Sequence, residues 1–416
     1  MKIAKSVNRL GTEAVYNIFA KTKKLAKALE FHKSAIKYKP KEATFYYNLG
    51  NDYAELEKLE EALELFKKAV TINPNYKAPI KMLSLLFWKV GRLQEAEQLS
   101  ILSTEGQSKS ALDYNTLGNI YKDQGKLYLA QKTFEHGLAN HPETPLLQFN
   151  VGLIQLSEYN FSEGWNNYRG RRVDKNNFAD IRQYWRDTPA KNNILLYTEQ
   201  GIGDDIMFSQ LLPEITSLTN ACYVMCPPRL APLYNRSFSN ITTIPTLKPS
   251  QLEAFINKKS ITITTPVGEL ANFLRSDISD FTPPKSYLKA DTVVIKKWTK
   301  RYSALGQGLK IGISWVGGVR HESYKSRSID LEHWTKLLTL PNCHFINLQH
   351  GKHSEEIQQL KDIHNITLYH WQDSNPLNDM DDFAGQVAAL DLVISIDNTN
   401  VHLAAALGVP TWIFLS

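Results

Sequence analysis

Cysteine is scarce in this sequence: 3 of the 416 residues are cysteines, namely Cys222, Cys226 and Cys343. Three cysteines cannot all pair within one chain, and their spacing matches no zinc-binding pattern. Cys222 and Cys226 lie on an apolar, strand-like segment. We therefore expect structural thiols in a reducing compartment and no metal site, which argues against a secreted, disulfide-rich scaffold.

Long apolar runs are also missing. The N-terminal segment MKIAKSVNRLGTEAVYNIF is basic but lacks the apolar stretch of a signal peptide. The most apolar segments, IKMLSLLFW and HLAAALGVPTWIFL, are too short or too interrupted to span a bilayer. The sequence therefore predicts a cytoplasmic protein without a transmembrane segment, and leaves peripheral association with the inner membrane open.

Neither sign of charge dominates the composition. Lysine and arginine number 48 and aspartate and glutamate 42, a net charge of +6. This balance favours anionic ligands but is too weak to indicate nucleic-acid binding. The length predicts two or three domains, and 43% hydrophobic residues are typical of a globular protein.

The N-terminal part of the chain is repetitive. Three sets of positions recur at one constant offset: Ala28, Ala62, Ala96 and Ala130; Leu49, Leu83, Leu117 and Val151; and, with one gap, Pro40, Pro74 and Pro142. Within one repeat the order Leu49-Gly50, Tyr53, Ala62, Phe66, Ala69 and Pro74 matches the tetratricopeptide pattern in both residue type and period. We predict clear repeats at 43–76, 77–110 and 111–144, a looser one at 9–42 and a partial one at 145–172. A stacked array over residues 1–172 would offer a concave face to a peptide or protein.

The partial repeat ends in the segment YNFSEGWNNYRGRR, residues 159–172. Two interpretations stay open. The basic cluster Arg169, Arg171 and Arg172 could bind a phosphate or a substrate. Alternatively, the segment is a capping helix whose aromatic residues Trp165 and Tyr168 contact the next domain, with cations favoured near its C-terminus.

From residue 191 short apolar runs alternate with helical stretches, which predicts β/α units and parallel sheets. The first series has expected strands at 193–197, 221–225, 241–244 and 261–264 and helices at 204–219, 228–236, 250–258 and 266–274. A proline-bearing connector, 281–291, follows. The second series has expected strands at 310–315, 343–348, 366–369, 392–396 and 410–415 and helices at 330–339, 353–362, 381–389 and 399–407. We predict Rossmann-like domains at 173–285 and 286–416, with ligands at the carboxyl ends of the strands.

The segment GIGDDIMF, residues 201–208, follows the first expected strand. Gly201 and Gly203 permit a close approach of backbone to ligand. Ile206 occupies the position of the third glycine, so the dinucleotide fingerprint is absent. Asp204 or Asp205 could cap the helix, or one carboxylate could project into the cleft as a general base.

Two later segments offer groups for a diphosphate. In LDLVISIDNTNVHLAAALG the strand ends at Asp397, and a helix that begins near Thr399 carries His402 in its first turn. Free amides at a helix start form an anion site, although Asp397 could be an N-cap and His402 a packing residue. In the other segment Gly317 and Gly318 open a loop after a strand, and Lys325, Arg327 and Ser328 precede the next helix. Cations there could neutralise a leaving diphosphate, or the loop could simply be solvated.

Taken in order, these segments resemble the heptosyltransferase-like glycosyltransferases, family nine of the usual sequence classification. The whole chain is similar to bacterial proteins that fuse tetratricopeptide repeats to such a domain. The matching stretches run from about 160 to 416: GWNNYRGRR, LLYTEQGIGDDIMFSQLLPEI, PPKSYLKAD, IGISWVGG, SRSIDLEHW, INLQHG and AALDLVISIDNTNVHLAAALGVPTWIFL.

The resemblance implies the two-domain GT-B fold and an inverting sugar transfer from a nucleotide diphosphate sugar, without metal or other cofactor. It implies that Asp204 is the base and that Lys325 and Arg327 contact the diphosphate. It also implies that the nucleotide-sugar site is lined by Asp397, Asn398, Thr399 and His402. The repeats would then select a protein or polysaccharide acceptor.

The chain departs from the family in two places. Asn398 stands where the family often has threonine, although asparagine can still cap a helix. The sequence stops at Ser416, directly after an expected strand, so we expect an incomplete second Rossmann-like domain. The alternative function is a non-catalytic tetratricopeptide adaptor with a degenerate or truncated transferase domain. An NAD-linked enzyme is disfavoured by the missing third glycine.

Overall fold

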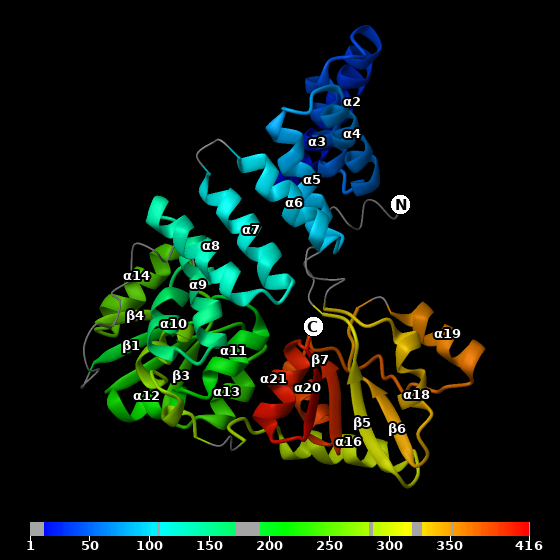
Figure 1. Ribbon diagram of the computed structural model, residues 1–416. Helices are drawn as coiled ribbons and strands as arrows, with labels where there is room; N and C mark the ends of the chain where they lie inside the picture. Colours follow the sequence, from blue (N-terminus) through cyan, green and yellow to red (C-terminus); the bar gives the residue numbers. More distant parts are fainter. Residues whose placement is uncertain are drawn as a thin grey trace. The chain divides into compact units, whose positions relative to one another are not determined.

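The computed structural model describes residues 12–105, 109–171, 192–282, 286–317, 327–351 and 353–415, with side chains from residue 25 onward. The chain forms two compact units, Met1–Ile154 and Gln155–Ser416. Unit 1 is helical, and unit 2 contains two parallel sheets with their helices (Figure 1).

Unit 1 is built mainly from helical hairpins. After the long helix α2 (Thr12–Tyr38), the helices pair in chain order: α3 (Ala43–Glu55) with α4 (Leu59–Ile72), α5 (Lys77–Lys89) with α6 (Leu93–Thr104), and α7 (Ala111–Asp123) with α8 (Leu127–Asn140). The last repeat helix, α9 (Pro145–Ser157), contains the boundary between the units. The three hairpins coincide with the repeats predicted at 43–76, 77–110 and 111–144, so the repeat architecture is confirmed.

The turns inside the hairpins keep the period of the repeat. Left-handed backbone recurs at Glu57, Gly91, Gly125 and Tyr159, with φ of 58°, 79°, 73° and 63°. The predicted hairpin at 9–42 is wrong. Lys23 lies one repeat before Glu57, where the pattern would place the turn, but α2 continues through Lys23 as one unbroken helix. The local sequence TKKLAKALE contains good helix formers and neither glycine nor proline, so nothing in it ends the helix.

Small residues let the paired helices of unit 1 approach closely. Ala62, Ala96 and Ala130 are fully buried. A Cβ atom at Gly118 would lie 2.3 Å from the Phe134 ring, so the ring occupies the space that a side chain would need. The same contact is made in the first hairpin, between Gly50 and Phe66. These contacts explain why the repeat has glycine on one helix and an aromatic residue on the next.

The first sheet of unit 2 is parallel and has the order β3-β2-β1-β4. Its strands are β1 (Asn193–Tyr197), β2 (Ala221–Met225), β3 (Ile241–Ile244) and β4 (Ile263–Pro266). Between and after them lie α11 (Ile202–Ser209), α12 (Leu212–Leu218), α13 (Ala231–Ser237), α14 (Pro249–Lys258), η3 (Val267–Glu269), α15 (Leu270–Leu274) and η4 (Ile278–Asp280). Because β2 and β4 flank β1, the carboxyl ends of β1 and β4 form the switch point of this sheet.

The second sheet repeats this plan with the order β6-β5-β7-β8, again parallel. Its strands are β5 (Leu309–Ser314), β6 (Cys343–Asn347), β7 (Leu392–Ile396) and β8 (Thr411–Phe414). The helices are α16 (Thr292–Ser303), η5 (Leu331–Trp334), α18 (Thr335–Leu338), α19 (Ser354–His364), α20 (Met380–Ala388) and α21 (Thr399–Leu407). The switch point lies between β5 and β7. Two parallel-sheet regions, as predicted, are therefore confirmed.

Several elements differ from the sequence prediction. The strand expected at 261–264 lies at Ile263–Pro266, and the helices expected at 266–274 and 330–339 each begin with a 3-10 turn. The strand expected at 366–369 is reduced to a single bridge, between Tyr369 and Ile346. The helix expected at 204–219 is two helices, because Pro213 cannot donate to the ladder of a continuous helix and instead lies in the first turn of α12. The helix α16 had not been expected; it begins after Asp291, whose side chain accepts hydrogen bonds from the amides of Val293 and Val294.

The predicted domain limits at 172 and 285 remain predictions, since residues 172–191 and 283–285 lie outside the described ranges. No helix in the described ranges combines the length and the apolar character needed to cross a bilayer.

Candidate functional site

The turn from β1 into α11 carries the predicted base. Gly201 precedes the helix, and its amide donates to Oδ2 of Asp204 at 3.0 Å. Asp204 therefore does cap the helix start, as one of the two interpretations proposed. The side chain stays partly exposed, so it can also reach a ligand. Gly203 is buried.

Asp205 has a different environment from its neighbour. It is 3% exposed, and one carboxyl oxygen, Oδ1, is buried without a hydrogen-bond partner among the described residues. Burial, supported by the charges of Asp204 and Glu199, raises the pKa of Asp205 to about 8. Asp205 therefore carries a proton at neutral pH and adds no negative charge beside Asp204. The sequence alone left open which of the two aspartates has which role.

The turn from β7 into α21 carries the predicted nucleotide-sugar residues. The N-cap is Asn398 and not Asp397: the Asn398 side chain accepts from the amide of Asn400 at 2.9 Å. Its Nδ2 donates to Oγ of Ser314 at 2.8 Å, which joins the ends of β7 and β5. Asn398 thus fixes the switch point, and Thr399 begins the helix above it.

The loop after β5 brings Arg327 to the same place. Its guanidinium donates to the carbonyl and to Oδ2 of Asp397, at 2.5 and 3.0 Å. The Nε atom of Arg327 is buried and has no partner within the described ranges. The amide of Gly317 donates to Oγ of Ser328 at 3.3 Å, and a Cβ atom at Gly317 would lie 2.4 Å from the Arg327 carbonyl. Lys325 and Gly318 lie outside the described residues.

The two turns face each other within unit 2. A Cβ atom at Gly203 would lie 3.0 Å from Cδ2 of His402 and 3.5 Å from Oγ1 of Thr399, so α11 and α21 are in direct contact. Burial lowers the pKa of His402, although Asp397 and Asp204 oppose the shift. His402 is therefore a neutral imidazole at pH 7 that faces α11.

The segment 159–171 contacts the first sheet. In α10 (Phe161–Tyr168), Nε1 of Trp165 donates to the Arg275 carbonyl at 2.9 Å, and the rings of Trp165 and Tyr168 contact Phe208 of α11. Arg171 is buried in ion pairs with glutamates. These contacts agree with the interpretation of this segment as a capping helix whose aromatic residues contact the next domain. Arg171 is not available to a phosphate. Arg172 lies outside the described residues.

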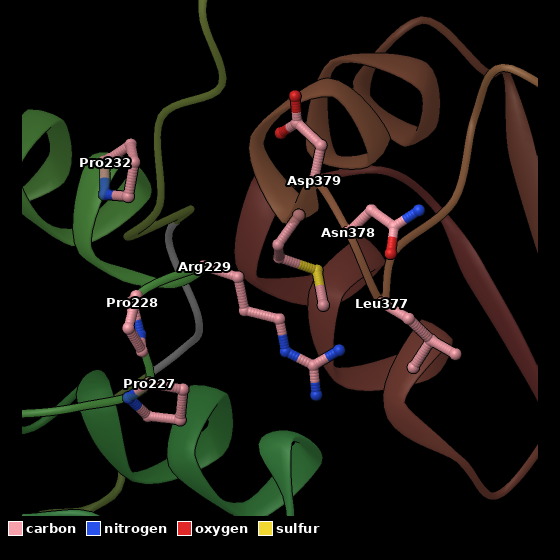
Figure 2. Close-up of a pocket in the computed structure, with 8 residues that line it drawn as sticks. Pro227, Pro228, Arg229, Pro232, Leu377, Asn378 and Asp379 are labelled. Atoms are coloured by element: carbon pink, nitrogen blue, oxygen red, sulfur yellow. The ribbon is translucent and has the colours of Figure 1, made fainter. Parts of the chain in front are cut away.

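A cavity of about 520 Å³ opens between the segment after β2 and the segment before α20. Figure 2 shows Arg229 extending from the first segment toward the second, where its Nη1 donates to the Pro376 carbonyl at 3.0 Å. Asp379 caps α20 through the amides of Asp381 and Asp382. Arg229 and Asp379 are thereby engaged within the protein. The other lining residues are Pro227, Pro228, Pro232, Leu377, Asn378 and Met380.

No group of three histidine, cysteine, aspartate or glutamate side chains that could hold a metal ion occurs in the part of the chain that the structure describes. The three cysteines are free thiols, and burial raises the pKa of Cys222 and of Cys226 to about 12. These two thiols are therefore poor nucleophiles and poor metal ligands at neutral pH.

Family models of the tetratricopeptide repeat match residues 43–76 and 114–142. Unit 1 carries tetratricopeptide repeats. Such repeats support a protein-interaction role for this part of the chain. The matches agree with two of the three hairpins derived from the period of the sequence.

Among curated proteins, Protein FlbA of Caulobacter vibrioides is 27% identical to this chain over 282 residues. The aligned region covers 64% of this chain and 47% of that protein, so the chain spans about half the length of the curated relative it matches.

Two solved structures match part of this chain. The crystal structure of YrrB, described as a TPR protein with an unusual peptide-binding site, has a TM-score of 0.32 and 17% identity, covering 34% of this chain and 74% of that one. MamA from Desulfovibrio magneticus has a TM-score of 0.34 and 15% identity, covering 37% of this chain and 87% of that one. Identities this low carry no information on function.

Proposed function

We propose that unit 2 is an inverting, metal-independent glycosyltransferase of GT-B type that uses a nucleotide diphosphate sugar. The repeats of unit 1 select its protein or polysaccharide acceptor. The observation that carries this proposal is the contact of Gly203 with His402 and Thr399. It brings the helix start that holds Asp204 against the helix start that follows Asp397, although the two segments belong to different sheets and are distant in sequence.

The sheet topology supports a ligand site at this contact. Open parallel sheets bind ligands outside the carboxyl ends of their strands, at the switch point. The turns after β5 and β7 leave the switch point of the second sheet, and the β1–α11 turn that carries Asp204 lies against it. A donor bound at this switch point would therefore lie beside both predicted sets of residues.

The charges beside α21 suit a diphosphate. Arg327 presents a planar cation beside the start of α21, where its guanidinium contacts Asp397. The N-terminus of α21 adds a positive dipole end. Neutral His402 can donate one hydrogen bond without adding a charge. Lys325 is proposed as a second cation for the diphosphate.

The chemical step follows from this arrangement. The carboxylate of Asp204 removes the proton from an acceptor hydroxyl, and the acceptor oxygen attacks the anomeric carbon from the face opposite the diphosphate. The bond from the anomeric carbon to the diphosphate breaks, and the nucleoside diphosphate leaves with the electron pair. Arg327, Lys325 and the start of α21 stabilise its charge, so the reaction needs no metal.

Calorimetric titration with a panel of nucleoside diphosphates and their sugars tests the donor site. We expect only the nucleoside diphosphates and sugars of one nucleobase to bind. Arg327→Met should weaken that binding by about 10- to 100-fold, because a charge-assisted hydrogen bond to an anion is worth about 1.5–3 kcal/mol. The matched control is Arg301→Met, which removes an arginine that pairs with Asp373 on the surface of the same region. Equal binding by wild type and Arg327→Met would contradict the assignment. Absence of binding by the wild type would leave the non-catalytic tetratricopeptide adaptor as the better explanation.

A further inference from the structure

The switch point of the first sheet is filled by a side chain from outside the sheet. The crevice between the carboxyl ends of β1 and β4 is the position where an open parallel sheet usually receives a ligand. Here the guanidinium of Arg171 occupies it. Gly268, the second residue after β4, leaves the necessary room, because a Cβ atom there would lie 3.1 Å from both Arg171 and Glu199.

Arg171 joins the loops that follow both strands. It donates to Oε1 of Glu199, in the β1–α11 loop, from Nε at 2.8 Å, and Nη2 lies 2.7 Å from the same oxygen. Its Nη1 donates to Oε1 of Glu269, in η3, at 2.9 Å. The exposed fractions of the Arg171, Glu199 and Glu269 side chains are 3%, 4% and 3%. A guanidinium that bridges Glu199 and Glu269 ties the two loops to each other.

The cluster is balanced in charge. Nε of Arg169 donates to the second oxygen of Glu269 at 2.7 Å, so two arginines face two glutamates. Burial alone would lower the pKa of Arg171, but the charges of Glu199 and Glu269 outweigh it and raise the pKa. Loss of one cation would leave a buried carboxylate without its partner, which proteins tolerate poorly. The ion pairs therefore favour a single arrangement of these four side chains.

The same segment holds the next residue of the loop as well. Nε2 of Gln200 donates to the hydroxyl of Tyr168 at 3.0 Å, and the Arg171 guanidinium lies 4.7 Å from the centre of the Tyr168 ring. Glu199 and Gln200 directly precede Gly201, whose amide binds Asp204. The backbone that leads into the proposed base is thus fixed by residues that come before the sheet in sequence.

We propose that Arg171 is a positioning residue, which holds the β1–α11 loop so that Asp204 faces α21. This inference rests on the proposed role of Asp204 as the base. A merely structural arginine would anchor α10 without affecting where the Asp204 carboxylate lies. The two cases differ in the electrostatic environment of His402, because Asp204 contributes to it.

The test is a double variant of the full chain, Arg171→Gln/Glu199→Gln, which removes one cation and one anion and leaves the Arg169–Glu269 pair. The readout is the titration of His402 by NMR, assigned with His402→Gln. If Arg171 positions Asp204, the pKa of His402 falls in the double variant in the same direction as in Asp204→Asn. Amide exchange of the peptide 198–204 should become at least about tenfold faster, since the loop loses its ties.

Two controls keep the result interpretable. Arg171→Lys preserves the charge but not the fork geometry, so it should shift the His402 titration in the same direction while disturbing the fold less. Arg301→Gln/Asp373→Asn removes an arginine–carboxylate pair elsewhere in unit 2 and should leave both readouts unchanged. An unchanged His402 titration and an unchanged loop exchange in the double variant and in Arg171→Lys would overturn the proposal. Neither readout uses a substrate, so a failure of the proposed function appears separately, as the absence of nucleotide diphosphate sugar binding by the wild type.

Discussion

At the scale of single residues, two adjacent aspartates in the first turn of α11 have opposite environments. Asp204 is partly exposed and accepts from a backbone amide, whereas Asp205 is buried beneath it. The hydroxyl of Tyr234 donates to the Asp205 carbonyl at 2.8 Å, and the Tyr234 side chain is itself buried. One residue of rotation, about 100° around a helix, is enough to separate the two carboxyl groups in this way.

The raised pKa of Asp205 predicts how stability depends on pH. Between its unfolded value of 3.8 and its folded value of about 8, the carboxyl is ionised in the unfolded chain but protonated in the folded chain. Rising pH therefore favours unfolding, and the stability that is full below about pH 4 is lost as pH approaches 8. Asp205→Asn removes this titration. We expect the free energy of unfolding of the variant, relative to wild type, to increase by about 2–3 kcal/mol from pH 5 to pH 7.

Urea titrations of both proteins at the two pH values measure this difference. Tryptophan fluorescence reports mainly on unit 2, because Trp88 is the one tryptophan among eight that precedes residue 155. A difference between variant and wild type that is the same at pH 5 and pH 7 would show that Asp205 does not titrate in this range.

At the scale of elements, the repeat depends on an aromatic ring against a helix backbone. Phe134 on α8 is fully buried and contacts Gly118 on α7. We expect Phe134→Ala to destabilise this hairpin by about 3–5 kcal/mol, because the change removes a fully buried ring and leaves a cavity beside Gly118. Tyr128→Ala on the same helix is the matched control, since Tyr128 is 69% exposed.

Amide exchange of peptides from α7 and α8 in the full chain provides the measurement. Phe134→Ala should raise the exchange rates of both helices, whereas Tyr128→Ala should not. Similar effects of the two changes would contradict the packing described for the repeat.

The elements that the sequence predicts best are those with a local signal. The strands 193–197 and 392–396 are short apolar runs bounded by polar residues, and the structure has both at these positions. The helix α16 was missed because only Trp298 and Tyr302 on it are buried, which leaves a weak apolar period. The cluster around Arg171 could not be predicted from the sequence, because Glu269 lies 98 residues further along the chain and no local pattern connects the two residues.

The candidate site shows the same division. The motif residues Asp204, Arg327 and Asp397 could be named from the sequence, and the contacts that bring their segments together exist in unit 2. Their assignment as base and diphosphate ligands remains a prediction. The internal use of Asn398, which links β7 to β5, could not be read from the sequence, because its partner Ser314 is 84 residues away.

At the scale of the whole molecule, unit 1 offers a protein-interaction array and unit 2 offers two sheet regions joined by specific contacts. Arg236 on α13 donates to both carboxylate oxygens of Asp381 at 2.6 Å. The hydroxyl of Tyr287 donates to the Ile206 carbonyl at 3.1 Å. These bonds, with the contact of α11 and α21, keep the proposed base next to the proposed donor site. The proposed reaction therefore requires both sheet regions.

The most direct test is the transfer reaction itself, measured as release of nucleoside diphosphate from the nucleotide diphosphate sugar that the wild type binds. Wild type and Asp204→Asn should bind this donor with equal affinity, because the base contacts the acceptor. The rate of Asp204→Asn should fall by about 100-fold or more, as expected for loss of a general base. Release by Asp204→Asn at the wild-type rate, with or without acceptor, would contradict the central claim.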